Sequence, residues 1–210
     1  MIRVLIADDH AVVREGLRQI LTKQSDMVVA GEAASGSEVL NKIRESNFDV
    51  VLLDLTMPGR SGLEILTEIR KENAAPRVLI LSVHSESLYA VRALKAGASG
   101  YLTKESAPEQ LVDAIRKVSG GGKYITPSLA ERLANELEAD FDKPPHEKLS
   151  DREYQVLCML ASGKTVKEIA HELSLSVPSI STYRARVLEK MNMKNNAELA
   201  HYAIRSGLVD

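Results

Sequence analysis

The first 120 residues alternate between short apolar runs and amphipathic stretches, and this alternation limits the possible folds more than any other feature of the chain. The apolar runs are rich in Val, Ile and Leu, and they lie at residues 4–6, 27–30, 50–53, 78–81 and 101–102. Between them, apolar residues recur at the spacing of a helix, in segments 11–22, 37–45, 62–71, 86–95 and 108–118. Strands that alternate with helices pair in parallel, and the helices cover both faces of the sheet. The sequence therefore predicts an α/β domain with a doubly wound, five-stranded parallel sheet.

A glycine-rich stretch at residues 119–123 ends this pattern, because three consecutive glycines do not continue a helix cheaply. A short amphipathic helix is expected to begin near Pro127. Residues 138–148 follow, and their charges and two prolines are typical of an exposed tether. We therefore predict a first domain at residues 1–120 and a linker with a short helix at residues 121–147.

The remaining residues, 148–210, have helical periodicity throughout and are predicted to form a small all-α domain. Ser150 and Thr165 each stand three residues before a glutamate, which is the spacing of a capping box at a helix start. Residues 165–191, TVKEIAHELSLSVPSISTYRARVLEKM, have the pattern of a helix, a tight turn and a second helix. This pattern predicts helix-turn-helix geometry.

Two of the predicted strands end on acidic residues. Asp8 and Asp9 follow the first strand, and Asp54 follows the third. These strands are neighbours in a doubly wound sheet, and ligands bind such sheets at the carboxyl ends of the strands. Three carboxylates that meet there repel one another and favour a hard divalent cation, most naturally Mg²⁺.

Two further polar residues follow strands and should reach the same edge. Ser82 offers a hydroxyl group and Lys104 offers a mobile ammonium group. Together with a metal ion these groups suit a phosphoryl group, because the cations neutralise its oxygens and Ser82 donates a hydrogen bond. Asp54 is the candidate nucleophile, since carboxylates can form aspartyl-phosphate.

Each of these residues also has an ordinary explanation when it is taken alone. Asp9 could cap the helix that begins near His10, and a lysine after a strand is usually solvated. The arrival of five such residues at strand ends favours a site. A nucleotide-binding site is disfavoured, because G-x-G-x-x-G does not follow the first strand and G-x-x-x-x-G-K-[ST] does not occur.

The second helix of the helix-turn-helix segment carries polar side chains that suit phosphates and base edges in a DNA major groove. They are Ser179, Ser181, Thr182, Tyr183, Arg184 and Arg186. Lysines nearby could contact the DNA backbone; they are Lys164, Lys167, Lys190 and Lys194. Residues 146–210 carry nine basic and eight acidic side chains, so composition alone slightly favours a helical hairpin with a solvated polar face.

The composition of the chain indicates in which cellular compartment the protein is expected. The formal net charge of −2 argues against general coating of nucleic acid, and the lack of an apolar stretch of about 18 residues predicts no transmembrane helix. Cys158 is the single cysteine, so an internal disulfide and a cysteine-based zinc cluster are excluded. We expect a cytoplasmic protein without a membrane partner.

Four stretches of the first domain resemble the receiver domain of two-component response regulators, which has a flavodoxin-like fold. They are ADDH, LLDLTMPGRSG, LILSVHS and AGASGYLTK, and the resemblance covers residues 1 to about 120. It implies that Asp54 accepts a phosphoryl group from a sensor histidine kinase. It also implies that Asp9 and Asp54 bind the metal ion, with help from Asp8 and the backbone carbonyl of Thr56. Ser82 and Tyr101 would take the switch positions, and Lys104 would pair with the phosphate.

Residues 148–210 are similar to the LuxR-type DNA-binding domain, and the whole chain resembles the NarL/FixJ family of response regulators. The string Tyr-Arg-Ala-Arg at 183–186 is similar to the GacA/UvrY-type branch. The family often has Lys-Thr where this chain has Pro178-Ser179, so a phosphate contact is lost. As a hypothesis, Arg184 and Arg186 carry more of the DNA binding in consequence.

The resemblance implies a transcription regulator that is controlled by phosphorylation. The phosphorylated receiver would favour a homodimer, and two helix-turn-helix modules would then read two half-sites of double-stranded DNA. The dimer interface could lie on the first and fifth helices of the receiver or on the last helix. Two alternatives stay open: a phosphatase of the aspartyl-phosphate type, although Thr56 stands where such enzymes have a second acid, and a DNA-binding regulator that works without phosphate.

Overall fold

The structure is a computed structural model that describes residues 1–57, 59–72, 75–83, 86–138 and 144–209. It divides into two compact units, Met1–Ala130 and Glu131–Asp210, and each is described here by itself. The tether predicted at residues 138–148 falls in part on residues 139–143, which lie outside the described residues. Among the helices that are described, none is long and apolar enough to cross a membrane.

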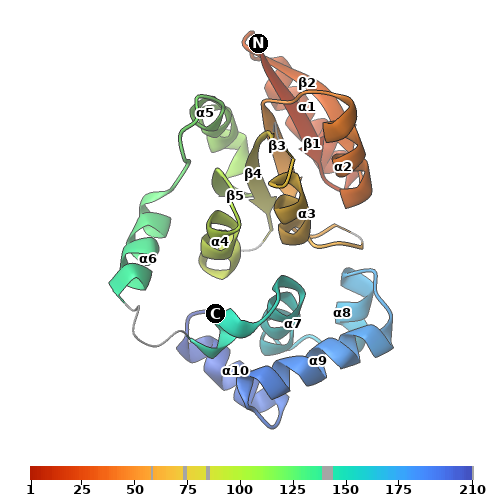
Figure 1. The fold of residues 1–210 in the computed structure, drawn as a ribbon, viewed down its shortest axis with the longest axis vertical. Coiled ribbons are helices and arrows are strands. Elements are labelled where there is room, and N and C mark those ends of the chain that lie inside the picture. The colour runs from red at the N-terminus through yellow and green to blue at the C-terminus, as the bar shows by residue number, and fades with distance from the viewer. Residues whose placement is uncertain (58, 73–74, 84–85, 139–143, 210) are drawn as a thin grey trace. The chain divides into compact units, whose positions relative to one another are not determined.

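The first unit is built on a five-stranded parallel sheet (Figure 1). Its strands are β1 (Ile2–Ala7), β2 (Met27–Ala33), β3 (Val50–Asp54), β4 (Arg77–Ser82) and β5 (Gly100–Thr103). Their spatial order is β2-β1-β3-β4-β5, so the predicted α/β fold with a doubly wound sheet is confirmed. β1 and β3 are direct neighbours, with Ile6 opposite Leu52 and Ala7 opposite Leu53. This register brings the residues that follow Ala7 close to the end of β3.

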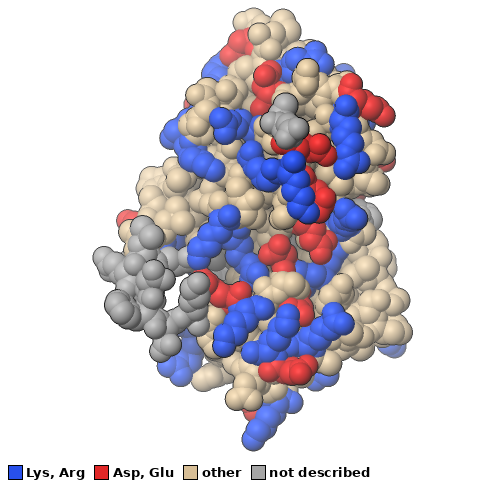
Figure 2. Space-filling view, viewed as in Figure 1, with Lys and Arg blue, Asp and Glu red and all other residues tan. Residues whose placement is uncertain are grey.

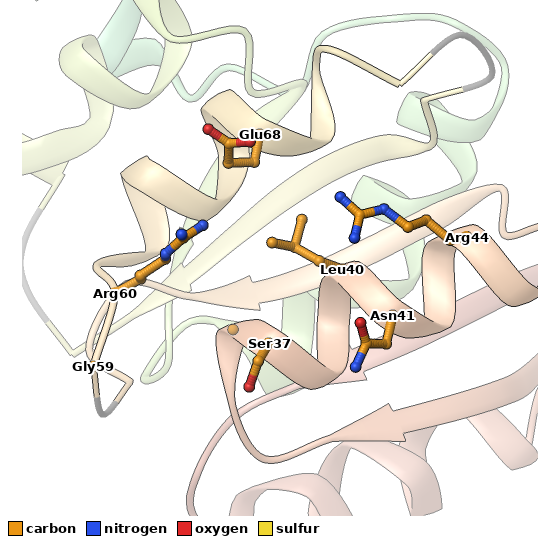
Figure 3. Close-up of a pocket in the computed structure, with 8 residues that line it drawn as sticks. Ser37, Leu40, Asn41, Arg44, Gly59, Arg60 and Glu68 are labelled. Carbon is orange, nitrogen blue, oxygen red and sulfur yellow. The ribbon is translucent and has the colours of Figure 1, made fainter.

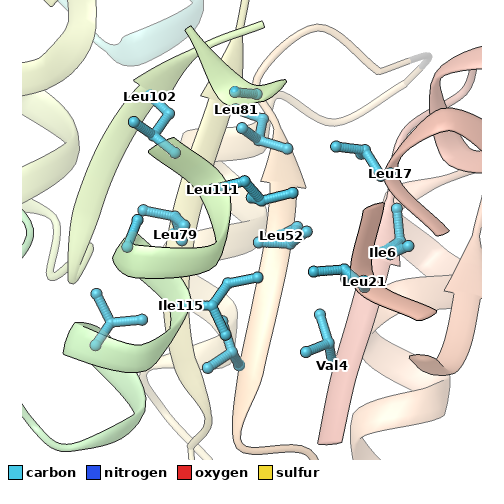
Figure 4. Close-up of a cluster of buried hydrophobic side chains, with 14 of the residues drawn as sticks. Val4, Ile6, Leu17, Leu21, Leu52, Leu79, Leu81, Leu102, Leu111 and Ile115 are labelled. Atoms are coloured by element: carbon cyan, nitrogen blue, oxygen red, sulfur yellow. The ribbon is translucent and has the colours of Figure 1, made fainter. Parts of the chain in front are cut away.

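Helices connect these strands. They are α1 (Ala11–Thr22), α2 (Gly36–Glu45), α3 (Gly62–Ile69), α4 (Glu86–Lys95) and α5 (Ala107–Ser119), and α6 (Pro127–Glu138) follows. One face of the sheet packs against α1 and α5, where Leu17, Leu21, Leu111 and Ile115 meet the strand residues (Figure 4). Each fully buried Leu or Ile contributes roughly 2 kcal/mol. This packed layer holds the strand ends in fixed positions.

The second unit is helical. Its elements are the 3₁₀ helix η1 (Pro145–Lys148) and the helices α7 (Asp151–Ala161), α8 (Val166–Glu172), α9 (Val177–Met191) and α10 (Asn196–Arg205). Both predicted capping boxes are present, at Ser150 and at Thr165. α8 and α9 form the predicted helix-turn-helix, and Ser174 in the turn between them has a positive φ of 52°. Ile180 and Val187 are the fully buried residues that fix which side of α9 faces the helical core.

Candidate functional site

The acidic residues that follow β1 and β3 converge at one edge of the sheet. Carboxylate oxygens of Asp8, Asp9 and Asp54, together with a ring nitrogen of His10, all lie within 4.8 Å of one another. Asp8 and Asp54 are each 1% exposed. Carboxylates held this close in a buried position repel one another, and a hard divalent cation would relieve that repulsion. The donor set therefore fits Mg²⁺.

Lys104 reaches the same cluster from the loop after β5. Its Nζ lies 2.6 Å from Asp8 Oδ2 and 2.8 Å from Asp54 Oδ2, and its side chain is 16% exposed. Burial would lower the pKa of Lys104, but its attraction to Asp54 and Asp8 outweighs burial and raises the pKa above its usual value. The ammonium group is therefore charged and serves as the counter-ion of both carboxylates.

The Asp54 carboxylate is held from both sides. Its Oδ1 accepts a hydrogen bond of 3.0 Å from the backbone N–H of Thr56, while Oδ2 faces Lys104. Behind it, α3 packs so closely that a Cβ at Gly62 would lie 2.4 Å from the Asp54 carbonyl oxygen. Burial raises the pKa of Asp54, and the opposing effects of Lys104 and the Thr56 N–H do not cancel it. The result is a fixed, poorly solvated carboxylate.

Ser82 and Tyr101 lie in the strands that lead to this edge. Ser82 is the last residue of β4 and is fully buried, and its carbonyl oxygen accepts a hydrogen bond of 2.7 Å from the backbone N–H of Lys104. Tyr101 lies in β5 and its ring is also fully buried. Thr56 is two residues beyond Asp54, and its Oγ1 is buried without a hydrogen-bond partner among the described residues. The switch and metal-binding roles of these three residues stay predictions.

Two neighbours of the acids, His10 and Arg14, make contacts that the sequence pattern alone does not predict. His10, and not Asp9, occupies the N-cap position of α1, so the interpretation of Asp9 as a helix cap is wrong. The His10 ring Nδ1 lies 2.9 Å from Asp9 Oδ1. Arg14 Nη1 donates a hydrogen bond of 2.7 Å to the backbone carbonyl of Asp8. The sequence contains one signal for the Arg14 contact, because Arg14 lies between the apolar residues Val13 and Leu17 of an amphipathic helix.

A groove of about 550 Å³ lies elsewhere on the first unit, between α2 and α3. Arg44 and Arg60 approach it from opposite sides, and Ser37, Asn41 and Glu68 complete its polar lining (Figure 3). Arg44 is already paired with Glu72, at 3.1 Å. None of the acids of the cluster lines this groove, so the sheet edge and the groove are separate features.

In the second unit, the predicted DNA-contacting residues fall into two groups. On α8 and α9 the side chains of Lys167, Ser181, Thr182, Arg186 and Lys190 are exposed, and that of Lys190 is also ion-paired. Figure 2 shows basic side chains, with acidic ones among them, over the region of α9. α9 begins at Val177 with Ser176 as its N-cap, and the Ser179 hydroxyl is bonded to the Ser176 hydroxyl at 2.8 Å.

The other basic candidates are engaged within the unit. Arg184 Nε donates a hydrogen bond of 2.7 Å to Asn196 Oδ1 on α10. Lys190 Nζ lies 2.6 Å from Glu153 Oε2 on α7, and Lys164 pairs with Glu172. Tyr183 is half-buried. The contacts of Arg184 and Lys190 hold α9 against α10 and α7. The DNA-binding roles of all nine residues stay predictions.

Comparison with known proteins identifies both units. Residues 4–116 match the response regulator receiver domain, and residues 147–203 match the bacterial regulatory proteins of the luxR family. The chain belongs to the response regulators with a LuxR-type DNA-binding domain. Within this family the chain is 40% identical to the response regulator UvrY of Escherichia coli K12, over 99% of this chain and 96% of that protein. It is 39% identical to the response regulator GacA of Pseudomonas viridiflava, over 100% of this chain and 99% of that protein. The expected likeness to the GacA/UvrY branch is confirmed.

Solved structures of response regulators are also similar to this one. The complex of the two-component response regulator RcsB with DNA has a TM-score of 0.60 at 26% identity, covering 98% of each chain. RcsB from Salmonella enterica serovar Typhimurium, bound to the rprA promoter with the phosphomimetic BeF₃⁻, has a TM-score of 0.63 at 26% identity, covering 96% of this chain and 98% of that one. This response regulator therefore shares both its sequence family and its fold with DNA-binding proteins.

Proposed function

We propose that this response regulator is a transcription regulator in which phosphorylation of Asp54 by a sensor histidine kinase promotes dimerisation and binding to double-stranded DNA. The observation that carries the proposal is the placement of Lys104 Nζ between Asp8 and Asp54, at 2.6 and 2.8 Å, at the sheet edge where the acids meet. The same family includes the DNA complexes of RcsB, which support the DNA partner and the dimer.

The chain's own residues suit this transfer. The Asp54 carboxylate attacks the phosphorus, and the bond between phosphorus and the kinase histidine nitrogen breaks with its electron pair going to that nitrogen. Because the other ring nitrogen of the phosphohistidine carries a proton, the histidine leaves as neutral imidazole. The Asp54 carboxylate suits the role of nucleophile because it is buried and held in place by Lys104 and by the backbone N–H of Thr56. Lys104 then pairs with the phosphoryl oxygens, and the Ser82 hydroxyl donates a hydrogen bond to them.

A bound Mg²⁺ would neutralise charge on the phosphoryl oxygens. The residues that would hold it are Asp8, Asp9, Asp54 and the backbone carbonyl of Thr56. The acid cluster supports this assignment, since its oxygens already lie within reach of one ion. When the phosphoryl group draws Ser82 and Lys104 towards it, Tyr101 would rotate into the space that Ser82 leaves, and the receiver shifts between two states.

We further propose the domain limits 1–120, 121–147 and 148–210 and a DNA-binding face made of Lys164, Lys167, Ser179, Ser181, Thr182, Tyr183, Arg184, Arg186 and Lys190. The exposed Arg186, Ser181 and Thr182 support the central part of this face. Sustained hydrolysis of small phosphate esters is not expected, because Thr56 offers no second acid near Asp54. A cytoplasmic location follows from the proposed DNA partner.

The test combines labelling with DNA binding. Wild type and Asp54→Asn are incubated with acetyl phosphate and Mg²⁺, and the mass increase of one phosphoryl group is measured. Binding of both proteins to an immobilised pool of random double-stranded oligonucleotides is then measured with and without beryllofluoride. The oligomeric state of each protein under the same two conditions is measured by gel filtration. We expect labelling, dimerisation and stronger DNA retention for the wild type alone. A wild type that is never labelled, or DNA retention that ignores beryllofluoride, would contradict the proposal.

A further inference from the structure

Arg14 connects three elements beside the acid cluster. It lies in the first turns of α1, and its side chain is 18% exposed. Its Nη1 donates a hydrogen bond of 2.7 Å to the backbone carbonyl of Asp8, at the end of β1. Its Nε donates a weaker bond of 3.3 Å to Glu32 Oε2 on β2. The guanidinium plane is therefore held in one orientation between a carbonyl and a carboxylate.

The carbonyl that Arg14 holds belongs to the peptide bond between Asp8 and Asp9. Because a peptide unit is planar, fixing its oxygen also fixes the position of the Asp9 nitrogen and Cα. Asp8 has three further restraints: its N–H donates to the Ala33 carbonyl at 3.1 Å, Oδ1 accepts from the His10 N–H at 2.8 Å, and Oδ2 faces Lys104. Asp8 is thus held at its backbone and at both carboxylate oxygens.

Asp9 is held far less firmly. Its side chain is 26% exposed, and its ion pair among the described residues is with the His10 ring, which is itself 65% exposed. A carboxylate with one exposed partner takes its direction mainly from its own backbone. The orientation of Asp9 towards the cluster therefore depends on the peptide plane that Arg14 fixes.

We propose that Arg14, oriented by Glu32, is a positioning residue that holds the Asp9 carboxylate where it can bind Mg²⁺ together with Asp54. This inference rests on the proposed function, because it concerns the same acid cluster. Arginine suits the role, since two nitrogens of one rigid plane bond two different partners, which a lysine ammonium on a flexible stem cannot reproduce. A residue that merely tied α1 to the sheet would affect stability and leave Mg²⁺ affinity unchanged.

The experiment compares Arg14→Met, Arg14→Lys and Glu32→Gln with Arg18→Met. Arg18 lies one turn further along α1. Its Nε donates a hydrogen bond of 2.9 Å to Glu15 of the same helix, and not to the aspartates of the acid cluster. Mg²⁺ binding is measured by isothermal titration calorimetry without a phosphodonor, and the Mg²⁺ concentration that gives half-maximal labelling by acetyl phosphate is measured separately. Hydrogen exchange of β1 and β3 amides in EDTA reports whether each receiver is folded.

We expect Arg14→Met to raise the Mg²⁺ dissociation constant about tenfold or more, as is found when outer-shell partners of metal ligands are removed. Arg14→Lys and Glu32→Gln should raise it by smaller factors, and Arg18→Met should leave it unchanged. The half-maximal Mg²⁺ concentration should rise in parallel with the dissociation constant.

The outcomes separate this inference from the proposed function. A wild type that binds no Mg²⁺ or accepts no label overturns the proposed function and this inference with it. If the wild type is labelled normally and Arg14→Met leaves the Mg²⁺ dissociation constant unchanged, the positioning role alone is overturned. If Arg14→Met does not fold, Arg14→Lys decides: a raised dissociation constant supports the role, and an unchanged one overturns it.

Discussion

Asp8 and Asp54 at the sheet edge are each 1% exposed, whereas Ser181, Thr182 and Arg186 on α9 are exposed to solvent. The acid cluster is restrained by backbone N–H groups, by Lys104 and by the register of β1 against β3. The polar face of α9 is the side of the helix that lies opposite its buried core residues and is open to solvent. A buried polar site therefore couples function to stability, while an exposed face can change its ligand contacts at little cost to the fold.

The largest expected effect tests the coupling at the buried site. Lys104→Met leaves two buried carboxylates without their counter-ion, so in EDTA we expect the free energy of unfolding of the receiver to fall by about 3 kcal/mol. Mg²⁺ should restore much of the loss, because it would replace the missing positive charge. Hydrogen exchange of the β3 amides measures the receiver separately from the second unit.

Lys23→Met is the matched control for that measurement, since Lys23 is an exposed lysine at the end of α1. It should change stability by less than about 0.5 kcal/mol. Equal protection of β3 in the wild type and Lys104→Met, both in EDTA, would show that the acid cluster does not depend on Lys104.

The second prediction separates two arginines of the exposed face. Arg186 has no hydrogen-bond or ion-pair partner among the described residues, whereas Arg184 bonds Asn196 on α10. Arg186→Ala should weaken DNA binding by about 2 kcal/mol, reduce the salt dependence of binding and leave stability unchanged. Arg184→Ala should weaken DNA binding less than Arg186→Ala does, and it should also lower the stability of the second unit by about 1 kcal/mol. Fluorescence anisotropy at several salt concentrations and thermal unfolding measure the two effects, and equal losses of affinity at equal stability would contradict this division.

The same contrast explains what the sequence could predict. Parallel strand order follows from the alternation of strands and helices, and that order forces Asp8, Asp9 and Asp54 to one edge. The same strand order places Lys104 at this edge, so the position of these four residues could be predicted from the topology of the sheet alone. The direction in which each side chain of a helix points is harder to predict from the sequence. Arg184 and Arg186 are only two residues apart, yet they face different surroundings.

Some contacts depend on tertiary packing that periodicity does not encode. Lys190 was interpreted as a DNA-backbone contact because it is a lysine near the predicted face, but its partner Glu153 lies 37 residues earlier on α7. The bond of Arg14 to the Asp8 carbonyl depends on the turn between β1 and α1, which the spacing of apolar residues does not predict. Sequence patterns locate charged residues but do not pair them.

The third prediction concerns the ion pair that anchors α9 to α7. Burial would raise the pKa of Glu153, but the bonds from Lys190 and from the Ser150 N–H and hydroxyl outweigh burial and lower it. A carboxyl group with a lowered folded-state pKa stabilises the fold above its unfolded pKa, about 4.3. That contribution is lost as the pH falls through the folded pKa.

Glu153→Gln keeps the capping-box geometry but removes the charge, so it should cost about 1 kcal/mol at pH 7 and progressively less as the pH falls below about 4. Lys190→Met should show a similar loss at pH 7. The combined variant should lose less than the two single losses added together. Urea unfolding across this pH range checks the sign, and a Glu153→Gln cost that stays constant down to pH 3 would exclude the ion pair as its cause.

The smallest expected effect lies in the helix-turn-helix turn. Ser174 adopts a φ of 52°, a conformation that is unstrained for glycine and unfavourable for serine. Ser174→Gly should therefore stabilise the second unit by about 0.5 kcal/mol without weakening DNA binding. Ser162→Gly is the matched control, because Ser162 has a φ of −77° and bonds the Cys158 carbonyl at 2.9 Å, so glycine there should be destabilising. Thermal unfolding gives both signs, and a loss of stability in Ser174→Gly would mean that the serine side chain has a role in the turn that outweighs its backbone strain.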